Sequence, residues 1–296
     1  YAALSSDTLG SSSVAIGTSA LAVQNFTTAT NSYNIAIGRN AGASVTTGIN
    51  NTIIGGLSGD AITTGNDNTS LGLNSLSANT ASNRNTAIGS ATLQSFNVTT
   101  DTHTYNTAVG YNAGQTLTTG TQNTLIGGLA GDALTDADFN VAIGLNALSS
   151  DTLGSTSVAV GASALFSQNF TTATDSYNVA VGTNTGAAIS TGIQNTLIGG
   201  KAGDALTDAD FNVAVGFQAL TTDTLGSNST AIGREALNNQ NFTTATDSNN
   251  TAVGYQAGRS VTTGTLNTLI GANTGDAITT GFDNVAVGRS ALTGED

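Results

Sequence analysis

Residues 106–110, Asn-Thr-Ala-Val-Gly, carry the motif that decides the fold, because the pattern Asn-(Thr/Val)-Ala-(Ile/Val)-Gly recurs along the whole chain. The intervals between its closing glycines run 21, 17, 17 and 17 residues and then repeat. The unit is therefore a module of 72 residues with four coils, one of them four residues longer. The sixteen copies end at Gly17, Gly38, Gly55, Gly72, Gly89, Gly110, Gly127, Gly144, Gly161, Gly182, Gly199, Gly216, Gly233, Gly254, Gly271 and Gly288.

The length and residue content of one coil favour β-structure. Seventeen residues are too few for the ~33–47 that a helical-pair repeat needs. Residues 106–110 and 116–120 are both short β-rich runs closed by glycine, which predicts two strands per coil. The chain has no proline, so stacked coils can pair without losing ladder hydrogen bonds.

We therefore expect an all-β protein, a parallel β-roll or β-solenoid of sixteen 17- or 21-residue coils. Four modules and eight further residues make residues 1–296 a single elongated repeat array. Both ends fall within a coil and neither has a distinct capping unit, so the array is expected to be a window of a longer fibre.

Alternation along the motif assigns its residues to two faces. The residue before each glycine is β-branched in all but one copy, and this uniform column is predicted to fill the inside of the coil. The residue before that one then points outward, where its apolar character predicts an interface between identical chains. This expected oligomer interface includes Ala36, Ile53, Ala108, Leu125, Ala180, Leu197, Ala252 and Leu269. The first motif residue, Asn in thirteen copies, is expected to form amide ladders along the stack. The glycine is expected to need a positive φ or a close backbone contact.

Charge and composition exclude several classes of function. There are 19 Asp and Glu against 6 Lys and Arg, a formal net charge of −13, so a nucleic-acid partner is not expected. The apolar runs are shorter than the ~18–20 residues that span a bilayer, so no membrane insertion by this segment is expected. With no cysteine and a single histidine, His103, we expect no catalytic residues and no enzyme.

The four longer coils are the most plausible recognition elements, because loops on a rigid scaffold commonly carry binding residues. Their aromatic residues either recognise a surface glycan or receptor, or fold back over the coil as a local core. The candidates are Phe26, Tyr33, Tyr105, Phe170, Tyr177 and Phe242.

No cofactor is expected, although calcium is an alternative at two pairs of carboxylates. Asp136 with Asp138, and Asp208 with Asp210, have the spacing that puts two side chains on one side of a strand. Hard oxygen ligands of this kind suit Ca²⁺. The competing interpretation is that these are exposed carboxylates at turns.

Two stretches resemble known fibre repeats. Residues 157–161, Ser-Val-Ala-Val-Gly, resemble the head repeats of trimeric autotransporter adhesins, which form a left-handed parallel β-roll. Residues 250–257, Asn-Thr-Ala-Val-Gly-Tyr-Gln-Ala, are similar to repeat arrays of bacteriophage tail-fibre proteins. The resemblance covers essentially the whole chain and implies a homotrimeric fibre, on a virion or a bacterial cell surface and hence extracellular, that mediates attachment. Adhesin heads have a shorter period of about fourteen residues, so the hand of the solenoid and the packing of the trimer do not carry over.

The resulting functional expectation is a non-enzymatic structural and adhesive fibre segment. One alternative is an ice- or surface-binding solenoid, indicated by threonine pairs such as Thr46-Thr47 and Thr63-Thr64 but interrupted by Asp136 and Asp208. Another is a glycan-binding or glycan-depolymerising tailspike, with an acidic cleft between chains.

Overall fold

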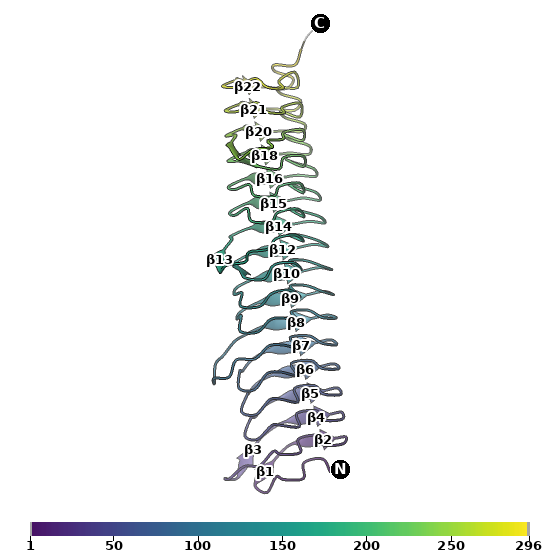
Figure 1. Ribbon diagram of the computed structural model, residues 1–296. Coiled ribbons are helices and arrows are strands. Elements are labelled where there is room, and N and C mark those ends of the chain that lie inside the picture. The colour runs from purple at the N-terminus through teal and green to yellow at the C-terminus, as the bar shows by residue number, and fades with distance from the viewer. Residues whose placement is uncertain (1, 295–296) are drawn as a thin grey trace. The chain divides into compact units, whose positions relative to one another are not determined.

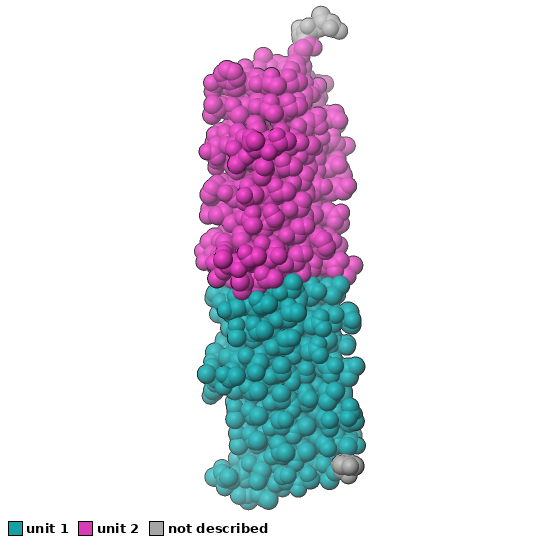
Figure 2. Space-filling view, in the orientation of Figure 1, with its two compact units in different colours: residues 1–143 teal, residues 144–296 magenta. Residues whose placement is uncertain are grey.

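A computed structural model describes residues 2–294, and within that range the protein is all-β with no helix. The chain is a parallel β-solenoid of about sixteen turns, as the sequence predicts (Figure 1). It divides into two compact units, residues 1–143 and residues 144–296 (Figure 2), which are considered separately below.

Each coil of the first unit contributes one three-residue strand to a parallel sheet. Neighbouring strands pair in register, so that Ala36 lies beside Ile53 and Ala108 beside Leu125. In order across the sheet the strands are β2 (Val14–Ile16), β4 (Ile35–Ile37), β5 (Thr52–Ile54), β6 (Thr69–Leu71), β7 (Thr86–Ile88), β8 (Thr107–Val109), β9 (Thr124–Ile126) and β10 (Val141–Ile143).

The second unit repeats this arrangement, with Ala180 beside Leu197 and Ala252 beside Leu269. Its sheet is built from β12 (Val158–Val160), β14 (Val179–Val181), β15 (Thr196–Ile198), β16 (Val213–Val215), β18 (Thr230–Ile232), β20 (Thr251–Val253), β21 (Thr268–Ile270) and β22 (Val285–Val287).

The longer coils carry small two-stranded parallel sheets at their loops. These pair β1 (Gly10–Ser11) with β3 (Thr30–Asn31), β11 (Gly154–Ser155) with β13 (Thr174–Asp175), and β17 (Gly226–Ser227) with β19 (Thr246–Asp247). In the second module a single bridge between Asn83 and His103 takes their place.

The prediction of two strands in every coil was wrong. Residues 116–120 form turns and bends, although Thr118 N–H still donates to the Thr135 carbonyl one coil further along (2.8 Å). Leu117 N–H turns back to the Gly114 carbonyl instead of pairing with a neighbouring coil. The run is therefore a stacked turn whose coils are still joined by hydrogen bonds.

The assignment of the two strand faces was also wrong, because it is reversed. The residues expected at an oligomer interface are fully buried inside the coils of their own chain: Ala36, Ile53, Ala108, Leu125, Ala180, Leu197, Ala252 and Leu269. They pack there with a second buried column of Leu21, Val45, Ile62, Leu76, Leu93, Leu117 and Leu134 in the first unit, and Leu148, Leu165, Ile189, Leu206, Leu220, Leu237 and Val261 in the second. The β-branched column that was expected inside faces outward.

The predicted asparagine ladder is confirmed, and the structure buries it inside the coils. Asn51 donates from its side-chain amide to the Gly65 carbonyl (2.8 Å), while its backbone N–H donates to Asn34 Oδ1 (2.9 Å). Asn68 repeats both contacts one coil later. Asn and Ala are two residues apart in the motif, so the ladder and the alanine column share the inner face.

The glycine prediction is confirmed as well. Gly38 has φ +138, and a Cβ there would lie 2.4 Å from the Gly55 carbonyl oxygen. The backbones of successive coils approach so closely at this point that no side chain fits.

Candidate functional site: the outward face of the parallel sheets

The strand residues that point outward form two parallel columns in each unit. Their side chains stand on a pleated surface with strands ~4.8 Å apart. Ile16 is 57% exposed, Leu71 41% and Ile198 41%. Each three-residue strand begins with Thr, Val or Ile and ends with Ile, Val or Leu. We call these residues the sheet face.

Residues that precede the buried Asn or Ser of the motif border the sheet face on one side. All are in the left-handed conformation, with φ between 49° and 63°. We call this column the N-edge: Ser12, Tyr33, Asn50, Asp67, Arg84, Tyr105, Gln122 and Phe139 in the first unit, and Thr156, Tyr177, Gln194, Phe211, Asn228, Asn249, Leu266 and Asp283 in the second.

Residues that follow the motif glycine border the opposite side. We call this column the C-edge: Thr18, Arg39, Gly56, Leu73, Ser90, Tyr111 and Gly128 in the first unit, and Leu145, Ala162, Thr183, Gly200, Phe217, Arg234, Tyr255, Ala272 and Arg289 in the second.

Most of the large apolar side chains that are exposed belong to the sheet face or to its two edges. Tyr105 is 49% exposed and Phe211 48% on the N-edge, and Tyr111 is 63% and Phe217 50% on the C-edge. Each unit thus presents one broad apolar surface, which is the kind of surface that marks an interaction site.

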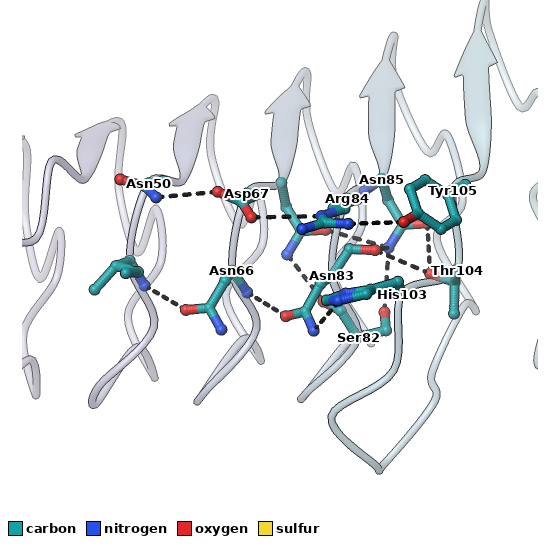
Figure 3. Close-up of polar contacts among 12 residues, drawn as sticks. Asn50, Asn66, Asp67, Ser82, Asn83, Arg84, Asn85, His103, Thr104 and Tyr105 are labelled. Atoms are coloured by element: carbon teal, nitrogen blue, oxygen red, sulfur yellow. Dashed lines mark hydrogen bonds and ion pairs between the residues drawn. The ribbon is translucent and has the colours of Figure 1, made fainter.

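Side chains on the N-edge are held in place by contacts from coil to coil (Figure 3). Asn50 donates to Asp67 (3.0 Å), and Asp67 Oδ2 lies 3.7 Å from Arg84 Nε. Arg84 Nη1 donates to the Tyr105 hydroxyl (2.7 Å), and its guanidinium lies 5.6 Å from the Tyr105 ring centroid. The hydrogen bond to Tyr105 is the main reason why the pKa of Arg84 is raised above its usual value.

The second unit has a comparable cluster beside its C-edge. The guanidinium of Arg234 lies 5.7 Å from the centroid of the Tyr255 ring and donates to Glu235 (2.7 Å). Gln256 also donates to Glu235 (2.7 Å), and this bond, followed by Arg234 and Arg259, lowers the pKa of the Glu235 carboxyl. The edge residues thus stack along each column.

The aromatic recognition candidates separate into two groups. Phe26, Phe170 and Phe242 are each only 6% exposed, so they lie in a local core under the longer loops, as the second interpretation expects. Tyr33, Tyr105 and Tyr177 are about half exposed and lie on the N-edge. The exposed tips of the longer loops are instead Thr-Thr-Ala at residues 27–29, 171–173 and 243–245.

The calcium candidates take part in hydrogen bonds between coils. Asp136 accepts from the Thr119 hydroxyl (2.6 Å), and Asp138 accepts from the backbone N–H of Thr121 (2.6 Å). In the second unit Asp208 accepts from Thr191 (2.7 Å) and Asp210 from the N–H of Ile193 (2.7 Å). No three His, Cys, Asp or Glu side chains are grouped for a metal among the described residues, and these residues enclose no pocket.

His103, the only histidine, lies in the bridge of the second module. Its Nδ1 is 3.4 Å from Asn83 Nδ2, and its ring meets Tyr105 edge to face at 6.0 Å between centroids. These contacts tie the longer loop to the coil before it.

Neither a protein-family model, nor a curated protein, nor a solved structure matches this chain. Residues 2–294 contain no helix that could cross a lipid bilayer.

The sheet face and its edges were missed at the level of sequence, although one signal pointed to them. Asn and Ala are two apart in the motif and must share a face, and a ladder of hydrogen-bonded amides is stable when it is buried. Placing Asn inside therefore places Ala inside and the Thr and Ile of the same strand outside.

Proposed function

We propose that this chain is a structural and adhesive fibre segment that acts without catalysis, and that three copies associate through their sheet faces. The observation that carries the proposal is the broad exposed apolar surface on each unit. Burying such a surface contributes about 25 cal/mol per Å². The resemblance of residues 250–257 to tail-fibre repeats favours an extracellular location, on a virion tail fibre or a bacterial surface.

Sedimentation equilibrium of the purified chain tests the association. Its mass is 29.2 kDa, and we expect a species of three times that mass. The variant I198K/I270K places two charges on the sheet face, where both side chains are 39–41% exposed, and should give a folded monomer. The control T263K, at an exposed turn, should remain trimeric. A wild-type chain that stays monomeric at every concentration contradicts the proposal.

The loop tips are the proposed point of contact with a surface glycan or receptor. Residues 27–29, 171–173 and 243–245 are exposed and have the same sequence, so each trimer would present them many times. The combined variant T28E/T172E/T244E should keep its Tm and its trimer but lose binding to cells or glycan arrays. The matched control T47E/T64E changes threonines that are exposed on shorter coils and should bind normally. Equal binding by both variants excludes the tips.

One observation favours ice or crystal-surface binding as a second candidate. Five successive strands of the first unit, β5 to β9, begin with an outward threonine: Thr52, Thr69, Thr86, Thr107 and Thr124. Hydroxyls and methyl groups spaced ~4.8 Å apart on a flat sheet offer a regular template. Thermal hysteresis of a monomeric sample that T86K abolishes would establish this function, and its absence would exclude it.

A further inference from the structure

In some of the coils, the residues on the two edges of the sheet face vary together from module to module. In the third coil of each module the N-edge and C-edge residues are Asn50 with Gly56, Gln122 with Gly128, Gln194 with Gly200, and Leu266 with Ala272. In three modules a side-chain amide on the N-edge accompanies glycine on the C-edge of the same coil. In the fourth module, where the amide becomes leucine, the glycine becomes alanine.

The fourth coil shows the same matching in the second unit. Phe211 accompanies Phe217, and 72 residues later Asp283 accompanies Arg289. An aromatic pair is thus replaced as a whole by a pair of opposite charges. In the first unit, the second coils pair Tyr33 with Arg39 and Tyr105 with Tyr111, which are combinations that attract each other across an interface.

These matched residues do not contact each other within the chain. A three-residue strand lies between them, and six residues of extended chain span up to about 20 Å. No ring contact joins Phe211 to Phe217 among the described residues, and within residues 2–294 neither Asp283 nor Arg289 has an ion pair. The contacts of edge residues run along one edge instead, as between Arg84 and Tyr105. Contacts within one chain therefore do not explain why the N-edge and C-edge residues of a coil match, and contacts with another molecule would.

A second copy related by rotation supplies that cause. When identical chains are arranged around an axis parallel to the stack of coils, with no shift along it, the N-edge of one copy meets the C-edge of the next at the same coil. We propose that this protein associates through its sheet face in a parallel, in-register ring, in which Phe211 of one copy packs on Phe217 of the next and Asp283 pairs with Arg289. The inference rests on the proposed self-association and adds its direction, register and contact pairs.

The charges on the edges agree with this arrangement. Arg39 and Arg289, both on the C-edge, have no ion pair or ring contact among the described residues, and in the ring they meet Tyr33 and Asp283. Asp67 lies in the same coil as Leu73 and is not matched to it, but Asp67 is already paired with Arg84 in its own chain. Arg84 with Ser90 and Asn228 with Arg234 are also unmatched, and both arginines likewise have a partner in their own chain. Tyr177 with Thr183 and Asn249 with Tyr255 are not matched either.

Charge introduction at Phe211 and Phe217 tests the register. F211K or F217E alone should weaken association at least tenfold, because each puts a charge against an aromatic ring in a desolvated contact. F211K/F217E should recover to within about threefold of wild type, since every interface then holds one opposite pair. The control F211K/Y255E carries the same charges two coils apart and should stay as weak as the single variants. Circular dichroism and Tm of all four variants establish that they fold.

Cross-linking provides an independent measurement, because the chain has no cysteine of its own. A short bismaleimide should join F211C/F217C chains into covalent trimers and leave F211C alone uncrosslinked. Cross-linking of F211C alone would mean that like edges meet, which overturns the parallel ring. Recovery by F211K/Y255E in place of F211K/F217E would overturn the register while leaving self-association intact. A wild-type chain that is monomeric throughout would instead refute the proposed association itself.

Discussion

Leu197 occupies space that Gly203 leaves open inside the second unit. A Cβ on Gly203 would lie 2.9 Å from Leu197 Cδ2, and one on Gly186 would lie equally close to Leu197 Cδ1. Leu125 has the same relationship with Gly114 and Gly131 in the first unit. The buried middle residues of the strands therefore include one large side chain in every four coils, Ile53, Leu125, Leu197 or Leu269, next to turns that lack side chains, and the other coils have alanine or, at Ser70, serine.

Substitutions at two neighbouring residues of β15 test which face of the strand is buried inside the coil. Leu197→Ala should lower the free energy of unfolding by about 2–5 kcal/mol, because it opens a cavity in a closely packed bore. Ile198→Ala, one residue away but 41% exposed, should change the stability of the folded coil by much less and should act mainly on association. Urea denaturation of the two variants, followed by circular dichroism at a concentration that gives monomers, compares them. Equal losses would mean that both side chains are buried.

The sequence predicts the period, the parallel stacking and the asparagine ladder, because each depends only on spacing along the chain. It does not decide which strand face is inside, because Ala36 and Ile37 are both apolar and alternation only says that they differ. Which face lies inside depends on the width of the solenoid interior, which the glycines near Leu197 set in three dimensions. Whether Phe26 lies in the core or at the surface depends likewise on how the longer loop folds back, and its residue type permits both.

The asparagine ladder makes a specific prediction at Asn123. Its side chain donates to the Ala137 carbonyl (2.7 Å) and its Oδ1 accepts the N–H of Asn140 (2.9 Å), all in a fully buried site. Asn123→Leu keeps the volume but leaves those two backbone groups without partners, which should cost about 2–5 kcal/mol. The exposed Asn25→Ala serves as a control and should cost less than about 1 kcal/mol. A near-neutral Asn123→Leu would show that packing and not the ladder stabilises this column.

A buried polar cluster in the third module makes a second prediction. Gln168 donates to Asp151 (2.6 Å) and to Ser157 (2.8 Å), and both Gln168 and Asp151 are fully buried. Gln168→Leu should cost about 3–5 kcal/mol, because it removes a partner from a buried carboxylate. The double variant D151N/Q168L should lose less than Q168L alone, because the carboxylate is gone. The second module has Asn79 and Phe96 at the corresponding positions, which shows that an amide beside an apolar residue is tolerated. Denaturation of both variants measures the coupling, and an equal loss in the two would exclude it.

Asp60 in the first unit should make stability depend on pH. Its Oδ1 is buried without a hydrogen-bond partner, and desolvation by burial raises the pKa of the carboxyl above 3.8. As pH rises past the ordinary pKa, the unfolded chain loses this proton first, so the folded state loses stability until its own raised pKa is passed.

Asp60→Asn should therefore raise Tm at pH 7 but not at about pH 3, where both states keep the proton. Asp204→Asn is the matched control, because the Thr221 hydroxyl already donates to Asp204, and it should give no gain. Scanning calorimetry at the two pH values checks this, and a gain from Asp60→Asn that is the same at both would mean that ionisation of Asp60 is not the cause.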